Sequence, residues 1–222
     1  DLVLWLDKNL WVKKELSAPE FNDFTKACHD FYYKKTNSRL SQYHEKYSIK
    51  DEPSTINGVD VPSLKEMFGV IDWDDLSNGT ASNFHGDLQF DNILLKSSGD
   101  FLLLDWRQDF SGIINYGDQY YDFAKLNGGM MVSYKLIKEG KFSYEIDAKG
   151  RVEISHNTPP ELSSGRDRLR RYFDQQSINP SKVNILTSLI FLNMSPMHHE
   201  PFDHFIYNLG KLTLYEHLLE QR

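Results

Sequence analysis

One short segment near the middle of the chain carries side chains that could perform phosphoryl transfer. Residues 85–105 read HGDLQFDNILLKSSGDFLLLD, in which Asp87 is followed five positions later by Asn92, and Asp105 ends the segment. One carboxylate can orient an attacking hydroxyl, while an amide and a second carboxylate can hold Mg²⁺ on nucleotide phosphates. The segment therefore predicts a catalytic role for Asp87 and metal binding by Asn92 and Asp105.

The elements around these residues explain how they could meet. Residues 92–96 and 101–105 are apolar runs of strand length. Residues 97–100 between them have the composition of a turn. A hairpin would return Asp105 to the start of the first strand, near Asn92, with the catalytic carboxylate on the loop just before. We expect the apolar Leu-Leu-Leu run to aim Asp105 inward.

Three motifs in this region resemble those of the aminoglycoside phosphotransferase and choline kinase family, distant relatives of the protein kinases. The family's loop has the form H-G-D-x-x-x-x-N, its second motif is a strand ending in Ile/Leu-Asp-Trp/Phe, and its third is G-D-x-x-x-D-L-A. The matching residues are His85, Gly86, Asp87 and Asn92, then Leu104-Asp105-Trp106, then residues 117–124 with Phe123 in place of Leu. The order and spacing make the resemblance specific, although it covers only residues 84–126.

The resemblance implies a protein-kinase-like α+β fold, with a mainly helical C-terminal lobe that carries a catalytic β-hairpin. It implies a kinase in which Asp87 positions a substrate hydroxyl while Asn92 and Asp105 bind Mg²⁺ and, through the metal, ATP. The acceptor would be an amino alcohol, an aminoglycoside or a sugar. The string DWRQDF at 105–110 looks most like bacterial kinase domains joined to nucleotidyltransferases in surface-polysaccharide pathways, so such a domain of the same polypeptide is a candidate partner.

Other polar residues near the motifs are expected to support the site. We expect His85 to hydrogen-bond backbone near Asp105 rather than to act as a base. Asp118 and Asp122 are expected to cap a helix or to brace the catalytic loop rather than to react.

Several groups leave two interpretations open. Arg107 and Asp109 could form an ion pair or touch substrate. His198-His199-Glu200 could suggest a metal site, but adjacent residues on extended backbone point to opposite sides, so a loop packed on the core is favoured. Trp73 and Tyr120-Tyr121 could line a cationic pocket by cation–π contact, although core packing is the better interpretation.

Composition limits the classes of partner. The chain has 222 residues with 40% hydrophobic and 26% charged residues, as expected for one globular domain. A net charge of −7 and no evident basic face make nucleic acid or an anionic membrane an unfavourable partner, and weakly favour a cationic substrate. Cys28 is the only cysteine, which excludes an internal disulfide and fits a reducing, cytoplasmic compartment. No apolar run reaches the ~20 residues that a membrane-spanning helix needs.

Periodicity and capping residues predict the remaining elements. Helices are expected at 17–47, 63–69, 118–138, 159–176, 180–194 and 201–220. Alternating polar and apolar residues predict a hairpin from 142–146 and 151–155, whereas 50–62 has the composition of a loop.

The residues ahead of the catalytic motif look mostly helical and contain no Gly-rich phosphate loop and no strand lysine of the Val-x-x-Lys type. We therefore expect residues 1–222 to form a single domain, the C-terminal lobe, with a hinge or linker remnant at 1–16 and the N-terminal lobe missing. The alternative is a kinase-like binding or regulatory module without catalytic activity. A weaker alternative is a metal-dependent hydrolase that uses the same carboxylates.

Overall fold

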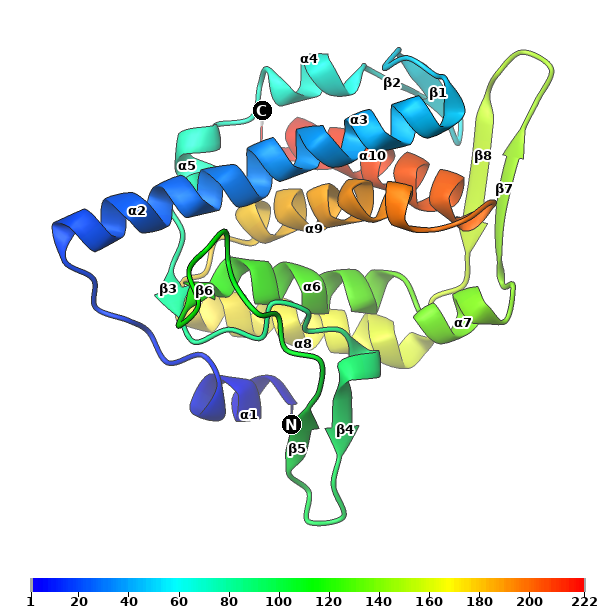
Figure 1. Ribbon diagram of the computed structural model, residues 1–222. Helices are drawn as coiled ribbons and strands as arrows, with labels where there is room; N and C mark the ends of the chain where they lie inside the picture. The colour runs from blue at the N-terminus through cyan, green and yellow to red at the C-terminus, as the bar shows by residue number, and fades with distance from the viewer. Residues whose placement is uncertain (1, 222) are drawn as a thin grey trace.

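A long, nearly continuous helical stretch runs along one side of the molecule. In the computed structural model, which describes residues 2–221, this stretch consists of α2 (Ala18–His29), a π-helical turn (Asp30–Lys34) and α3 (Lys35–Tyr47) (Figure 1). It begins where the Ser17 N–H and hydroxyl both donate to the Glu20 carboxylate, at 2.8 and 2.6 Å. The helix predicted at 17–47 is thereby confirmed.

Four further helices fill the centre of the molecule. They are α6 (Gln119–Met131), α8 (Pro160–Gln176), α9 (Pro180–Met194) and α10 (Phe202–Glu220). Helix α9 contacts α3, α6 and α10, and residues 185–192 are all buried, as expected for a helix that is apolar on every side. One hydrophobic core extends from Val3 to Leu218. The protein is therefore α+β and mainly helical.

A small four-stranded sheet lies at one end of this helical body, at the right of Figure 1. Its strands are β1 (Ser54–Ile56), β2 (Val59–Val61), β7 (Phe142–Ile146) and β8 (Val152–His156), in the order β2-β1-β8-β7. The predicted hairpin β7–β8 is confirmed. The prediction of a loop at 50–62 was wrong, because Asn57 and Gly58 (φ 49° and 75°) form a tight turn between β1 and β2. The Asn57 side chain also exchanges two hydrogen bonds with the Ile154 backbone, at 2.8 and 3.0 Å.

One helical prediction needed correction, and one short helix was not predicted. The helix expected at 118–138 is broken at Val132, which is buried with an extended backbone (φ −120°), and α7 (Tyr134–Lys138) begins after Ser133. The acidic stretch after Gly69 also contains a short helix, α5 (Trp73–Ser77), because Asp72 accepts the Asp75 N–H at 2.9 Å. The predicted helix at 63–69 is α4 (Leu64–Phe68).

The start of the chain is packed against the rest. Helix α1 (Leu2–Asn9) contributes Leu6 to the core, and Leu10 and Trp11 are buried directly after it. The Lys14 N–H then donates to the Ala81 carbonyl at 2.8 Å. The part of 1–16 that the structure describes is therefore folded onto the core and does not form a free linker.

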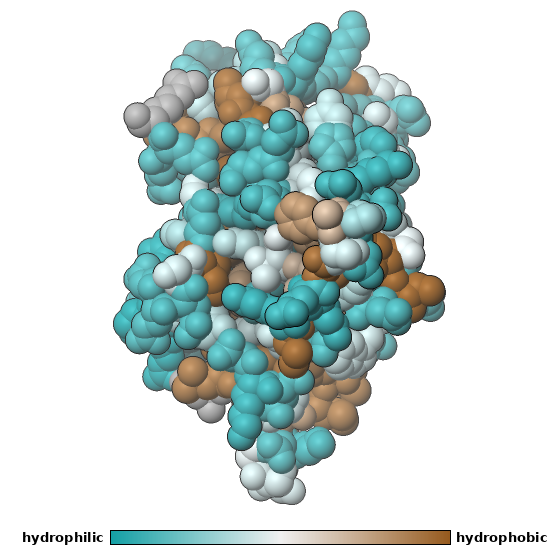
Figure 2. Space-filling model, turned by 90° about the vertical axis from the view of Figure 1, so that its left-hand side faces the viewer, coloured by the Kyte–Doolittle hydropathy of each residue, from teal (hydrophilic) through white to brown (hydrophobic). Residues whose placement is uncertain are grey.

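The surface is mainly hydrophilic, with small separate apolar patches on the face shown in Figure 2. Among residues 2–221, no helix combines the length and the apolar character that crossing a bilayer requires. The single cysteine, Cys28, is buried.

Candidate active site

The loop that carries Asp87 is held from below by a buried carboxylate. Asp122 of α6 accepts the His85 N–H and the Gly86 N–H, both at 2.8 Å, and the Trp11 indole N–H at 3.2 Å. Burial raises the pKa of Asp122 to about 6, and these hydrogen bonds oppose the rise. Asp122 therefore fixes the first two residues of the loop, the geometry expected of a brace.

His85 joins the loop to the end of the second hairpin strand. Its Nε2 donates to the Leu104 carbonyl at 2.7 Å, and its Nδ1 accepts the Asp87 N–H at 3.2 Å. Burial lowers the pKa of His85. Because Nδ1 accepts the Asp87 N–H, the ring proton lies on Nε2. The predicted hydrogen bond to backbone beside Asp105 is present.

Asp118 caps the helix that supplies the brace. Its Oδ1 accepts the Thr80 and Tyr120 N–H groups at 2.8 and 3.1 Å, and its Oδ2 accepts the Tyr32 hydroxyl at 2.7 Å. The carboxylate is fully buried, and burial raises its pKa. A side chain at Gly79 would place its Cβ 2.5 Å from this carboxylate, so the adjacent turn requires glycine.

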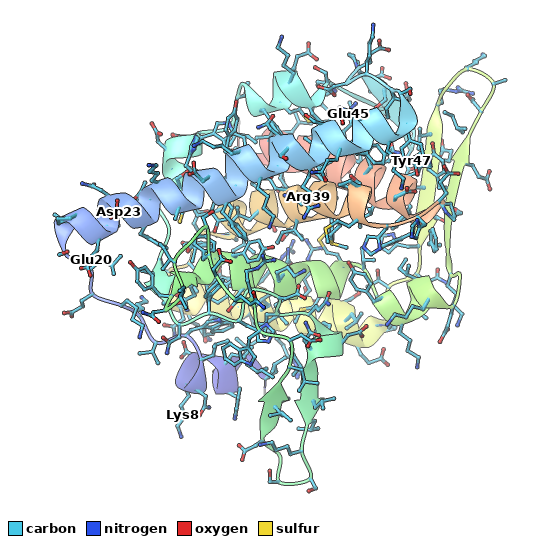
Figure 3. All side chains as sticks on the ribbon, viewed as in Figure 1. Lys8, Glu20, Asp23, Arg39, Glu45 and Tyr47 are labelled. Carbon is cyan, nitrogen blue, oxygen red and sulfur yellow. The ribbon has the colours of Figure 1, made fainter. Side chains whose placement is uncertain are left out.

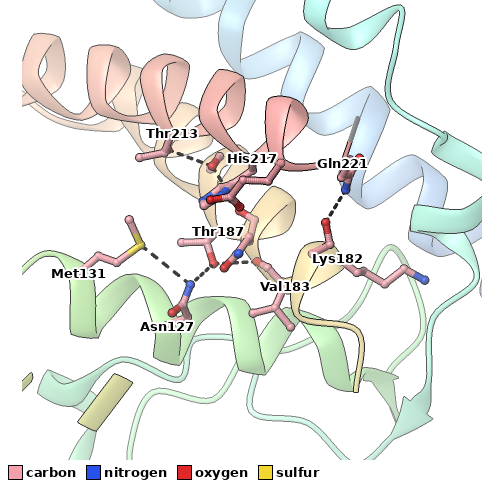
Figure 4. A network of polar contacts seen from close by, with 12 residues as sticks. Asn127, Met131, Lys182, Val183, Thr187, Thr213, His217 and Gln221 are labelled. Carbon is pink, nitrogen blue, oxygen red and sulfur yellow. Dashed lines mark hydrogen bonds and ion pairs between the residues drawn. The ribbon is translucent and has the colours of Figure 1, made fainter. Parts of the chain in front are cut away.

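Helix α6 is in turn fixed against α9 by a buried polar network, shown in Figure 4. Asn127 of α6 donates to the Thr187 hydroxyl of α9 at 3.0 Å and accepts a hydrogen bond from Arg166 of α8 at 3.1 Å. Thr187 donates to the Val183 carbonyl at 2.8 Å. Because Asn127 is hydrogen-bonded to both Thr187 and Arg166, these contacts set the position of α6 relative to α9 and α8.

Asp87 itself is partly exposed and has three side-chain partners, of which Gln89 is the most distant, with its amide donating to Oδ2 at 3.5 Å. Lys125 of α6 lies 2.6 Å from Oδ1, and the Asn92 amide donates to Oδ2 at 3.1 Å. The sequence prediction missed Lys125. It lies three residues after Asp122, so both side chains project from the same face of α6 toward the loop, and this spacing could have identified it.

Asn92 occupies the junction between the loop and the hairpin. It ends a 3₁₀ turn (Phe90–Asn92) that leads into β4 (Ile93–Leu95), which pairs with β5 (Phe101–Leu103). Its side-chain amide nitrogen also donates to the Asp87 backbone carbonyl at 2.9 Å. The backbone carbonyl of Asn92 accepts the Leu104 N–H at 2.9 Å. The predicted hairpin is therefore confirmed, and it brings Asn92 beside the residue that precedes Asp105.

Asp105 differs from its predicted environment. It is exposed rather than turned inward, because it adopts a left-handed conformation (φ 54°) that redirects the chain at the end of β5. Together with Asp87 it lines a cavity of about 490 Å³. The two carboxylates that sequence analysis selected thus face the same cavity.

Arg107 locks the loop and the strand end together. Its N–H donates to the His85 carbonyl at 2.9 Å and its Nε to the Gly86 carbonyl at 3.1 Å. Gly86 has φ 78°, and a Cβ there would lie 2.5 Å from the Arg107 Cβ. Asp109 instead accepts the Gly112 N–H at 2.8 Å, and within residues 2–221 it forms no ion pair with Arg107.

Of the remaining candidates of the sequence analysis, Tyr121 lines this cavity, whereas His198, Trp73 and Tyr120 do not. His198 belongs to a loop after α9, and its ring packs against Phe202 with centroids 4.9 Å apart. Trp73 packs against Phe68. Tyr121 is buried, and Arg107 Cζ lies 5.9 Å from the centroid of its ring. Tyr120 contacts a cation of its own chain, because Lys182 Nζ lies 5.0 Å from the ring centroid.

A metal at this site would need ligands from the substrate. Within the described part of the chain, no cluster of three or more His, Cys, Asp or Glu residues could hold a metal ion. Asn92 and Asp105 offer an amide oxygen and a carboxylate, and Mg²⁺ bound to a nucleotide completes its shell with phosphate oxygens and water. The donor set therefore fits nucleotide-bound Mg²⁺ and does not fit an all-protein metal site.

No family model, curated protein or solved structure matches the chain. The interpretation of the site therefore depends on the residues themselves and on their geometry.

Proposed function

We propose that this chain is the catalytic lobe of an ATP-dependent small-molecule kinase that transfers the γ-phosphoryl group to a hydroxyl of its substrate. The observation that carries the proposal is the common cavity of Asp87 and Asp105; Asn92 does not line this cavity but is hydrogen-bonded to Asp87. A positioned carboxylate beside an amide and a carboxylate of suitable chemistry for Mg²⁺ is what phosphoryl transfer requires.

In this proposal each polar residue has a distinct task. Bound Mg²⁺·ATP supplies the phosphoryl group and the metal that offsets its charge. Asp87, which lines the cavity, accepts a hydrogen bond from the substrate hydroxyl and so orients the hydroxyl for in-line attack. Lys125 holds Oδ1 of the same carboxylate through the ion pair at 2.6 Å. Asn92 and Asp105 are the residues that would hold the metal.

The exposed hairpin supports a second part of the proposal, a covering unit. The apolar side chains on and beside β4 and β5 have exposed fractions between 37% and 69%, and they are Leu94, Leu95, Leu102, Leu104 and Trp106. Within residues 2–221 no Gly-rich loop lies over them. We propose that the nucleotide base and an N-terminal lobe, or a nucleotidyltransferase domain of the same polypeptide, cover this surface.

The test is phosphoryl transfer by the full-length polypeptide with Mg²⁺·ATP and a panel of hydroxyl compounds. Transfer to one acceptor is expected, and Asp105→Ala should abolish it even at high Mg²⁺, because the charged metal ligand is lost. Glu139→Ala is a matched control, since this exposed carboxylate lies outside the cavity and pairs with Lys141. Unchanged turnover in the Asp105 variant would exclude the proposed metal site.

A kinase-like binding module remains the second candidate function, and the uncovered hairpin is the observation that favours it. Such a module would bind Mg²⁺·ATP without transferring phosphate to any acceptor or to water. Calorimetric binding combined with the absence of turnover in the full-length polypeptide would select this candidate.

A further inference from the structure

The cavity beside Asp87 is lined by an unusual number of positive charges. Four cationic side chains converge on it from three separate segments, the helical stretch that includes α3, the chain after β5, and α6; they are Lys35, Arg39, Arg107 and Lys125. Figure 3 labels Arg39 on the lower side of α3, toward α9. These charges lie in a hollow, in a protein whose net charge is −7.

Three of the four cations have no counter-charge in the described part of the chain. Lys125 forms the ion pair with Asp87. Arg39 contacts only the neutral Gln42 side chain, at 3.2 Å, and Arg107 donates to a backbone carbonyl. No carboxylate lies within ion-pair distance of either arginine or of Lys35 within residues 2–221.

Three carboxylates line the same cavity, and each has a partner or a proposed role. Asp87 is paired with Lys125, and Asp109 accepts the Gly112 N–H at 2.8 Å. Asp105 faces the metal in the proposed function. The cavity lining therefore holds four cationic side chains against three carboxylates, and neither arginine has an ion-pair partner within residues 2–221.

Lys35 and Arg107 also lie against one aromatic ring. Lys35 Nζ is 3.9 Å from the centroid of Phe31, and Arg107 Cζ is 5.2 Å from it. The pKa of Lys35 is lowered to about 7, chiefly by burial and then by the positive charges of Arg107, Arg39 and Lys125, while Asp87 opposes the shift. Like charges held together in a partly buried hollow are unfavourable until an anion enters.

We infer that this cavity binds an anionic group of the phosphoryl acceptor, so that the substrate is a hydroxyl compound carrying a phosphate or a carboxylate. The guanidinium groups of Arg39 and Arg107 can bind either anion through paired hydrogen bonds. The inference rests on the proposed function, because only a kinase has a phosphoryl acceptor. It replaces the amino alcohol or aminoglycoside that the family resemblance implies.

The arrangement favours the acceptor over the nucleotide as the source of the anion. Arg39 and Lys35 belong to the helical stretch that lies across the molecule from the β4–β5 hairpin, as Figure 1 shows. The hairpin carries the proposed metal and nucleotide site. An anion held by Lys35 and Arg39 would therefore approach Asp87 from the side opposite to ATP.

The inference can be tested by calorimetry of the full-length polypeptide with four small probes, glycerol 3-phosphate, glycerate, glycerol and ethanolamine. At least one anionic probe should bind about tenfold or more tightly than the neutral and cationic probes. Comparison of the first two distinguishes a phosphate from a carboxylate. Arg39→Gln should weaken anion binding by roughly 10- to 100-fold, the usual loss for one charge-assisted contact, and Arg39→Lys by less.

Lys34→Gln is the matched control for these variants. Lys34 carries the same charge one position before Lys35, but it is exposed and pairs with Asp30 at 2.6 Å. It should leave anion binding unchanged. Circular dichroism and melting temperature establish that each variant is folded.

Three results would overturn the inference. The first is that neither anionic probe binds. The second is that ethanolamine or glycerol binds as tightly as the anionic probes. The third is that Arg39→Gln weakens Mg²⁺·ATP binding as much as anion binding. The proposed function fails separately. Anion binding without phosphoryl transfer to any acceptor would reject the proposed kinase function and support the anion site. Transfer to ethanolamine without anion binding would support the kinase function and reject the anion site.

Discussion

The loop that carries Asp87 and the hairpin that follows it are adjacent in sequence but differ in how the chain supports them. The loop residues His85 and Gly86 have their N–H groups bound by Asp122, and that carboxylate is fully buried. The hairpin exposes apolar side chains such as Leu95 (69%), and Asp105 at its end is exposed to solvent. A site needs rigid support for positioning groups, whereas residues that meet ligands must stay accessible. The residues that support the loop should therefore affect stability. Asp87 and the hairpin residues should instead affect catalysis and ligand binding.

The largest expected effect tests the loop through Asp87. Asp87→Asn should preserve the fold and lower kcat by roughly 10²- to 10⁴-fold, the usual range for a group that positions or accepts a proton. Steady-state kinetics of the full-length polypeptide measures this. Near-normal kcat in a folded variant would remove Asp87 from the mechanism.

A second prediction concerns the brace. Asp122→Ala should lower both activity and melting temperature, because the His85 and Gly86 N–H groups lose their acceptor. Each buried unsatisfied group costs about 1–3 kcal/mol, and each kcal/mol shifts the melting temperature of a domain of this size by about 2–4 °C. Thermal denaturation is the measurement. Lost activity with unchanged melting would instead make Asp122 part of the reacting site.

The same carboxyl gives the loop a pH signature. The pKa of Asp122 is raised from 3.8 to about 6 in the folded protein, so folding favours its protonated form. Its contribution to stability is complete below the unfolded pKa and is lost as pH rises through about 6, amounting to about 3 kcal/mol. In Asp122→Asn this loss should disappear from the curve of unfolding free energy against pH. Parallel curves for the two proteins would show that Asp122 does not titrate in this range.

A smaller effect is expected at the junction of the two regions. Asn92→Ala should raise the Mg²⁺ concentration needed for turnover, while high Mg²⁺ restores part of the rate, because water can replace a neutral amide ligand. Titration of activity with Mg²⁺ measures the change. Coincident titration curves for the variant and the unmodified protein would argue against metal binding by Asn92.

The smallest effect on stability is expected in the hairpin. Leu95→Ser should change the unfolding free energy by no more than about 0.5 kcal/mol, since the side chain is exposed. It should nevertheless weaken Mg²⁺·ATP binding, because the proposal places the nucleotide and the covering unit on this surface. A stability loss as large as that of Asp122→Ala would erase the contrast between the two regions.

The sequence predicted those parts of the molecule that depend on local chemistry. The hairpin follows from two apolar runs around a turn, and the support of the loop by Asp122 was expected from the third motif. The ion pair between Lys125 and Asp87 was missed, because it depends on how closely α6 approaches the loop. The exposure of Asp105 was also mispredicted, since a single positive φ reverses the direction that strand alternation would give.

Long-range pairing explains the other failures. Strand β1 pairs in parallel with β8 through Ile56 and Val152, almost a hundred residues apart. A three-residue strand has too weak a local pattern to be recognised without that neighbour. The turn at Asn57-Gly58 was visible in the sequence, but only the sheet gives it two strands to connect.

The hydrogen bond between Trp11 and Asp122 gives the protein an internal optical probe. Trp11 is only 4% exposed and packs edge-on against Phe123 at 4.7 Å, whereas Trp106 is 50% exposed. A buried indole emits at shorter wavelength than a solvated one. In a variant with Trp5, Trp73 and Trp106 replaced by Phe, the emission would therefore come from Trp11 alone. It would report, without substrate, whether the segment after α1 still contacts the Asp122 that holds the loop.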